Sequence, residues 1–173
     1  LGYVSDSFVK EALESNLTLP VFDERYAKII SNAGNDLGKE AHIALEIDTG
    51  MSRLGFSHTL ELSKFLEKYK NIHVDFAISH LATSDSDNSY AHIQTEKFDK
   101  FLEINKDYSF ATSFLNSSGI ANFENRWTYT RPGLFLYGYE STNVLKQLKP
   151  VMSIWSEIAH VKYLKKGQSV GYG

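Results

Sequence analysis

Apolar and polar positions follow two periods along the chain, and the two periods alternate. Short apolar runs typical of buried strands lie at 17–22, 42–48, 72–80, 108–116 and 128–138. Around them, apolar residues recur at helical spacing in 6–15, 23–34, 57–70, 90–106 and 117–123. Strands that alternate with helices in this way predict a parallel sheet with crossover helices.

Two segments carry more specific expectations. Helix 23–34 ends on Gly34, a residue that commonly closes a helix. From Pro150 onward, PVMSIWSEIAHVKYL alternates well enough to predict one long strand of a different, β-type unit.

Composition excludes several classes of protein. The 173 residues suffice for one domain with a core, and a net charge of −3 gives no electrostatic case for nucleic acid or an anionic membrane. The absence of cysteine excludes disulfides and thiolate metal sites. No apolar run approaches the ~18 residues of a membrane span, and LGYVSDSF is no signal peptide. Both ends of the sequence are abrupt, which suggests an internal fragment of a longer chain.

The stretch EIDTGMSRLGF (46–56) places three charged side chains at the end of an apolar strand. Charges there are costly unless they are paired or used. Glu46 and Asp48 are two residues apart, so they face the same side of a strand. They could form an acid/base pair, or they could form a salt bridge with Arg53. The residue types favour the salt bridge.

Polar residues also follow the later strands, where parallel sheets usually carry their sites. Asn116-Ser117-Ser118-Gly119 could cradle a phosphate, although an ordinary helix cap is the more common use of such residues. Arg131 could contact a ligand, with Gly133 allowing close backbone approach, or it could extend to solvent. His80 ends its strand as either a structural or a catalytic group. The six histidines show no HExxH-type spacing, so no metal site is expected.

Six ordered motifs give the chain a resemblance that covers nearly its whole length. The chain resembles the pyridoxal-phosphate (PLP) dependent alanine racemases in IDTGMSRLGF (47–56), SHLATSD (79–85), YAHIQTEKFDKFL (90–102), NSSG (116–119), TRPGLFLYG (130–138) and LKPVMSIWSEIAHVKYLKKGQSVGYG (148–173). The resemblance implies an incomplete TIM (β/α)8 barrel, about strands 4–8, over 1–147. It implies the first strand of a β-rich C-terminal domain over 148–173, and a cytoplasmic homodimer.

The resemblance also assigns the cofactor site. Ser117, with the backbone N–H groups of Gly133 and Leu134, looks like the phosphate cradle of PLP, and Asn116 belongs to the same cradle. Arg131 looks like the group that faces the pyridine nitrogen. Because arginine stays protonated, it can donate a hydrogen bond to that nitrogen but hardly protonates it. An unprotonated ring is a weaker electron sink, which limits side reactions.

Two catalytic residues and one supporting residue are implied as well. His80 looks like the link between Arg131 and a catalytic tyrosine, and Arg53 looks like the arginine near the PLP phenolic oxygen and the substrate carboxylate. Family members often carry a carbamate-modified lysine where this chain has Glu46. Glu46 would then supply the negative charge beside Arg53 without any modification. We call this role an anionic brace.

The implied reaction is the interconversion of L- and D-alanine through a PLP aldimine and two-base proton transfer, which supplies D-alanine for peptidoglycan. The family's PLP-binding lysine is expected upstream of residue 1 and its catalytic tyrosine after Gly173, so the fragment alone should be inactive. Two alternatives stay open: a racemase of serine or a basic amino acid, and a non-catalytic PLP-binding barrel.

Overall fold

The structure is a computed structural model that describes residues 2–139, 144–145 and 147–172. Helices and strands mostly alternate as far as Leu136. Their order is η1 (Asp6–Phe8), α1 (Val9–Glu14), β1 (Leu19–Val21), α2 (Glu24–Leu37), β2 (Ala41–Asp48), β3 (Phe56–Ser57), α3 (Leu62–Lys68), β4 (Ile72–Ile78), α4 (Asn88–Ile104), β5 (Ala111–Asn116), α5 (Ser117–Asn122), β6 (Tyr129–Arg131) and α6 (Gly133–Leu136).

Five strands form a parallel sheet in the order β1-β2-β4-β5-β6, and the two-residue β3 pairs with β2. Strand order follows chain order, as expected when each strand returns over a helix on the same side. The predicted α/β class is therefore confirmed, and the parallel sheet is consistent with part of a (β/α)8 barrel. Among the described residues, no helix combines the length and apolar character that crossing a membrane requires.

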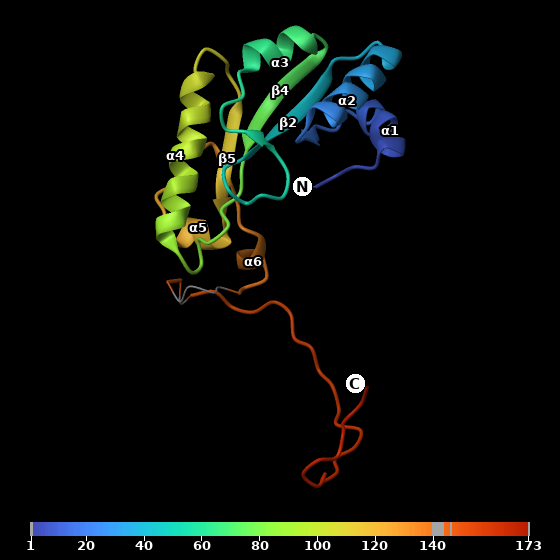
Figure 1. Ribbon diagram of the computed structural model, residues 1–173, viewed down its shortest axis with the longest axis vertical. Coiled ribbons are helices and arrows are strands. Elements are labelled where there is room, and N and C mark those ends of the chain that lie inside the picture. The colour runs from blue at the N-terminus through green and yellow to red at the C-terminus, as the bar shows by residue number, and fades with distance from the viewer. Residues whose placement is uncertain (1, 140–143, 146, 173) are drawn as a thin grey trace.

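The helices cover one face of this sheet. Along β2, Ile43, Leu45 and Ile47 are buried, whereas the alternate positions are partly exposed. The buried face packs against apolar side chains of α2, α3 and α4, and Phe98 of α4 stacks on Phe114 of β5 with ring centroids 5.1 Å apart. In Figure 1, β4 and β5 run down toward α5 and α6, so the carboxyl ends of the strands meet at that end of the sheet.

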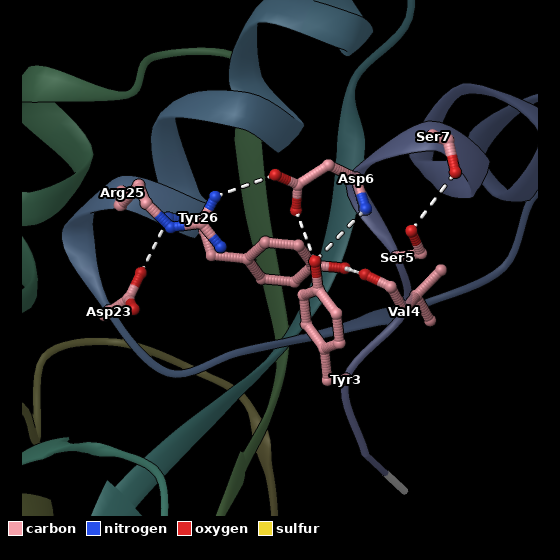
Figure 2. A network of polar contacts seen from close by, with 8 residues as sticks. All are labelled: Tyr3, Val4, Ser5, Asp6, Ser7, Asp23, Arg25 and Tyr26. Atoms are coloured by element: carbon pink, nitrogen blue, oxygen red, sulfur yellow. Dashed lines mark hydrogen bonds and ion pairs between the residues drawn. The ribbon is translucent and has the colours of Figure 1, made fainter.

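The segment before α1 is fixed to α2 by the polar network in Figure 2. Tyr26 donates from its hydroxyl to the Val4 carbonyl at 2.7 Å. Asp6 accepts from Arg25 and from the Tyr3 hydroxyl, each at 2.8 Å. Tyr26 is itself held by the helix cap, because its backbone N–H donates to the carboxylate of Asp23 at 2.6 Å. This network holds in place the segment that begins at Gly2, a residue that lines the site described below.

Two helix boundaries differ from the sequence-based expectation by three residues or more. Helix α2 continues past Gly34 to Leu37, and Gly38 takes the left-handed conformation (φ 62°) that ends it. Gly34 serves packing instead, because a Cβ there would lie 2.9 Å from the Asn71 side chain and 3.0 Å from the Lys39 carbonyl. Helix α3 begins at Leu62, later than predicted, because residues 56–57 pair with β2.

The expected strand 128–138 is wrong beyond Arg131. Strand β6 stops there, and Gly133–Leu136 forms the short helix α6. Short apolar runs such as GLFL fit a strand or a buried helix equally well by periodicity. Pro132 precedes the helix at φ −79°, an angle compatible with a helix start.

The strand expected from Pro150 is not formed in the described residues. Residues 150–172 are exposed throughout and contain no strand, and Figure 1 shows this segment leading away from the sheet. A strand needs a neighbour for its backbone hydrogen bonds, and among the described residues this segment makes only one such bond to the rest of the chain, from Val151 N to the Tyr137 carbonyl at 3.2 Å. The division into 1–147 and 148–173 stays a prediction.

Candidate functional site

Two adjoining cavities lie at the carboxyl ends of the strands. The larger, of about 660 Å³, is lined by Gly2, Glu46, Arg53, Leu54, Ile78, His80, Arg131, Pro132, Gly133 and Leu136. The smaller, of about 390 Å³, is lined by Met51, His80, Leu81, Ala82, Ser84, Asp85, Asn116, Ser117, Ser118, Arg131, Gly133 and Leu134. All the site residues predicted from the sequence therefore border one cavity or both. His80, Arg131 and Gly133 line both cavities and form their shared wall.

Asp48 organises the loop that carries Arg53. Its Oδ1 accepts from the backbone N–H groups of Gly50 at 2.9 Å and Ser52 at 3.0 Å. Gly55 then packs against the strand end so closely that a Cβ would lie 2.5 Å from the Asp48 nitrogen. The DTG turn is thus a structural device that brings Arg53 back over the end of β2.

No direct salt bridge forms between Arg53 and either carboxylate. Of the ion pairs within 4 Å among the described residues, none includes Glu46 or Asp48. The direct pairing favoured by residue type is therefore wrong, because Asp48 is used by its own loop and Arg53 extends toward solvent.

Glu46 is the least satisfied polar group of this site. Its Oε2 is buried and has no hydrogen-bond partner among the described residues. Burial raises the pKa of Glu46, and the nearby positive charges of Arg53 and Arg131 oppose that rise. The carboxylate thus lies in the electrostatic field of both arginines without touching Arg53.

Arg131 is fixed in place by neighbouring strand ends. Its Nη1 donates to the Ser113 hydroxyl of β5 at 2.6 Å, and its Nη2 donates to the backbone carbonyl of Ser79 after β4. Nη2 also lies 3.4 Å from Nδ1 of His80. Burial lowers the pKa of Arg131, and the Glu46 carboxylate counteracts this. A guanidinium nevertheless stays protonated in proteins, so Arg131 is a rigid, permanently charged donor.

His80 is set up to be neutral. Burial lowers its pKa, and the positive charges of Arg131 and Arg53 lower it further. Because the Nη2 donor of Arg131 faces Nδ1, that nitrogen is the acceptor, and the ring proton belongs on Nε2. His80 can therefore donate one hydrogen bond from Nε2 while Arg131 supports its other nitrogen.

The predicted phosphate cradle combines capping groups with free donors. Asn116 caps α5, because its Oδ1 accepts from Gly119 N at 2.9 Å and from the Ser84 hydroxyl at 2.8 Å. Its side chain is thus used within the protein, as an ordinary cap would be. By contrast, the N–H groups of Gly133 and Leu134 open α6 and have no acceptor within the described part of the chain.

Ser117 supplies a hydroxyl beside those free donors. It is buried, and among the described residues its Oγ accepts only a long hydrogen bond of 3.4 Å, from Phe135 N. Gly133 leaves open space, because a Cβ built there meets no atom within 4 Å. The arrangement can accept a small anion between the start of α6 and the end of β5.

Sequence reasoning missed the residues that hold His80 in position. Gln94 of α4 is fully buried; its Nε2 donates to the His80 carbonyl at 2.9 Å and to the Thr49 hydroxyl at 3.2 Å, and its Oε1 accepts from Ala82 N at 2.8 Å. Thr49 in turn contacts the Ser79 hydroxyl at 2.9 Å. The one available signal was a glutamine on the otherwise apolar face of helix 90–106.

Comparison with known proteins identifies the family to which this chain belongs. Residues 1–141 match the model of the alanine racemase N-terminal domain. The alanine racemase of Methanococcus maripaludis is 33% identical over 184 aligned positions, which cover 99% of this chain and 49% of that protein. The chain therefore spans about half the length of the curated relatives that it matches.

Solved structures share the fold. An alanine racemase from Clostridium difficile 630 superposes with a TM-score of 0.78 at 24% identity, over 87% of this chain and 42% of that one. A second, from Bartonella henselae with covalently bound pyridoxal phosphate, has a TM-score of 0.68 at 23% identity, over 80% of this chain and 41% of that one. With the N-terminal-domain match extending over most of its length, this chain belongs to the alanine racemase family.

Proposed function

We propose that this chain is the cofactor-holding part of a PLP-dependent alanine racemase, an isomerase that interconverts L- and D-alanine. The observation that carries the proposal is the position of Arg131, which lies in the wall between two cavities and is fixed by Ser113 and Ser79. One cavity offers donors suited to a phosphate, and the other gathers the charged groups suited to an amino acid. Relatives named alanine racemase support the substrate.

The residues present fit PLP. The phosphate would be held by the Ser117 hydroxyl and the N–H groups of Gly133 and Leu134, which lack acceptors among the described residues. The Asn116 side chain would support this cradle by capping α5 and not by direct contact. When bound, PLP supplies the electron sink that stabilises negative charge at the α-carbon of the substrate.

Arg131 would control how strong that sink becomes. Its Nη atoms contact Ser113, Ser79 and His80, whereas its Nε–H and one Nη1–H have no acceptor among the described residues. Those donors can hydrogen-bond the ring nitrogen without transferring a proton to it, because the guanidinium keeps its proton. Such a contact would favour moderate stabilisation of the negative charge at the substrate α-carbon and would limit side reactions.

His80 and Arg53 would serve the proton transfer and the substrate. His80, neutral and protonated on Nε2, can hydrogen-bond a tyrosine from another part of the protein and hold its phenolic oxygen in position. A charged neighbour behind this histidine, here Arg131, helps to lower the pKa of such a partner. Arg53 would bind the substrate carboxylate, with Glu46 as an anionic brace acting through space or through one water.

The proposed protein would be a homodimer in the cytoplasm that supplies D-alanine for peptidoglycan. Residues 1–147 would belong to its barrel and 148–173 would begin its β-rich domain. The PLP-binding lysine and catalytic tyrosine of the family would lie outside this chain.

The test compares the isolated chain with the protein at its natural length. Each is mixed with PLP and L-alanine, and D-alanine is followed in a coupled assay. The natural-length protein should racemise alanine, and the isolated chain should not, because each missing acid/base group costs ~10²–10⁴-fold.

Other outcomes separate the alternatives. Faster racemisation of serine or lysine than of alanine by the natural-length protein would identify a different substrate. PLP binding without turnover of any amino acid would identify a non-catalytic PLP-binding barrel. Turnover by the isolated chain close to that of the natural-length protein would contradict the assignment of the missing groups.

A further inference from the structure

A second cluster of ionisable side chains lies at the opposite end of the same strands. His42 is the second residue of β2 and His73 the second residue of β4, and the two are register partners. Asp75 follows two residues later on β4. At ~3.3 Å per residue along a strand, His42 lies roughly 13 Å from Glu46, so this cluster is separate from the cavities described above.

The three side chains converge on one point. Oδ1 of Asp75 lies 2.8 Å from Nδ1 of His42 and 3.7 Å from Nε2 of His73. One ligand atom from each residue lies within 4.8 Å of the others. The two imidazole centroids are 5.1 Å apart. The Thr18 hydroxyl donates to Oδ2 of Asp75 at 2.8 Å, which fixes the carboxylate with Oδ1 turned toward both histidines.

We propose that His42, His73 and Asp75 bind a zinc ion. Zinc binds imidazole nitrogen and carboxylate oxygen at ~2.0–2.2 Å in tetrahedral sites, which places neighbouring ligand atoms about 3.3 Å apart. The observed separations bracket that spacing, so small side-chain rotations suffice. Two imidazoles exclude magnesium and calcium as the preferred ions, because those ions select oxygen ligands. Three protein ligands leave the fourth position to solvent.

A simple His42–Asp75 hydrogen bond explains less of this arrangement. His42 and His73 side chains are about half exposed, at 49% and 52%, and exposed ion pairs contribute little to stability. A single pair would need neither the second histidine opposite the first nor the hydroxyl that orients Asp75. The pattern of two imidazoles, one carboxylate and an outer hydrogen bond to that carboxylate is typical of a metal site.

The position of the cluster in the fold, and not its three-ligand coordination, indicates an ion that stabilises the sheet. Thr18 directly precedes β1, His42 lies on β2, and His73 and Asp75 lie on β4. An ion there would bridge the amino ends of β2 and β4, and Thr18, just before β1, would be linked to it through its hydrogen bond to Asp75. In (β/α)8 barrels this end of the sheet serves stability, whereas the opposite end carries the chemistry. Zinc should therefore raise thermal stability and leave the groups around Arg131 unaffected.

The test is a zinc titration of the chelator-treated protein, with zinc chloride as the probe and calorimetry or a competing chromogenic chelator as the readout. We expect one zinc ion per chain. His42→Ala, His73→Ala and Asp75→Asn should each weaken zinc affinity by about 10-fold or more, since even loss of an outer partner costs ~10–100-fold. The matched controls are His92→Ala and His160→Ala, two exposed histidines outside the cluster, and they should bind zinc as the unmodified protein does.

A milder variant guards against loss of folding. Thr18→Val keeps all three ligands and removes only the hydrogen bond to Asp75, so it should bind zinc about 10-fold more weakly with an unchanged circular dichroism spectrum. Zinc should raise the melting temperature of the unmodified protein but not that of Asp75→Asn. The absence of zinc binding, or equal loss of affinity in the control variants, would overturn the proposal. Neither result depends on PLP, so failure here is distinguishable from failure of the proposed function.

Discussion

The two ends of strands β2 and β4 hold charged side chains in opposite situations. At the amino ends, His42 and Asp75 are in direct contact and the histidines are half exposed. At the carboxyl ends, Glu46 of β2 has a buried oxygen without a hydrogen bond, and burial lowers the pKa values of His80, which follows β4, and of Arg131 in β6. Strands β2 and β4 thus carry a self-paired cluster at one end and border an incompletely paired one at the other.

The difference shows where a ligand is needed. The partly solvated side chains at the amino ends already contact one another, so they are stable without an ion, and the zinc proposed there would add stability to an existing arrangement. Buried polar groups almost always find a partner in native proteins, and perturbed pKa values gather at functional sites. A carboxylate without a partner beside free backbone N–H groups therefore marks the carboxyl end as the place that a cofactor and substrate would complete.

The largest effect is expected from removing Arg131, the hydrogen-bond donor that is fixed in place at the carboxyl ends of the strands. In the natural-length protein, Arg131→Ala should lower the rate of alanine racemisation by roughly 100-fold or more, as loss of a preorganised electrostatic contact does. PLP should be retained through Ser117 and the α6 backbone, with a changed absorption spectrum because the ring nitrogen has lost its donor. Steady-state kinetics and absorption spectroscopy measure both.

The control for that variant is Arg126→Ala. Arg126 is an exposed arginine that pairs with Asp99, and its loss should leave the rate and the spectrum unchanged. If Arg131→Ala behaves like this control, then Arg131 does not face the cofactor ring.

Glu46→Gln should separate stability from activity. Because burial raises the folded-state pKa of Glu46, its charge opposes folding at pH values above the unfolded-state pKa of about 4.5. The gain from Gln should thus grow as pH rises through the folded-state pKa and be fully present at pH 8. Urea denaturation should show a more stable variant at pH 8 and no difference at pH 4.

The same substitution should lower racemisation by about 10-fold, because Arg53 loses its anionic brace. Removing bicarbonate from the buffer should not affect the unmodified protein, since its negative group needs no carbon dioxide. Glu61→Gln, which changes an exposed carboxylate paired with Lys64, is the control and should alter neither property. A less stable Glu46→Gln protein at pH 8 would show that the carboxylate has a stabilising partner in solution.

Local patterns predicted much of the fold, and contacts between distant segments explain the rest. The alternation of strands and helices was predictable because periodicity depends on a few neighbouring residues. The end of β6 at Arg131 was not predictable, because the segment RPGLFL fits a strand or a helix equally well by periodicity. Packing in the folded protein determines which of the two forms. The carboxyl-end location of Arg53, His80 and Arg131 followed from the rule that parallel strands gather their sites there.

Pairing could not be predicted from residue types alone. Residue types favour a salt bridge to Arg53 and leave open whether Glu46 contacts it directly or through water, but the Asp48 turn directs Arg53 outward. Histidine spacing along the chain predicts no metal site, because motifs such as HExxH describe ligands one helical turn apart. His42 and His73 meet only through the register of two strands, which no local spacing reveals.

The smallest expected effect concerns the pH dependence of stability. Burial, Arg131 and Arg53 lower the folded-state pKa of His80, while the Glu46 carboxylate lies within the same cavity. In the unfolded chain this histidine takes up a proton near pH 6.5, and in the folded protein only at lower pH. Stability should therefore fall as pH decreases from about 7 toward the folded-state pKa. His80→Gln should reduce that loss, seen as a smaller decrease of the urea midpoint between pH 7.5 and 5.5.

His58 supplies the internal comparison for that measurement. Burial, Lys100 and Lys97 also lower its pKa, yet it lies on neither cavity wall. His58→Gln should reduce the pH dependence of stability in the same direction, and the two substitutions should add because the residues share no partner. Only His80→Gln should also change the pH profile of racemisation, since it alone would contact the catalytic tyrosine. Equal pH profiles for both variants would place His80 among the structural histidines.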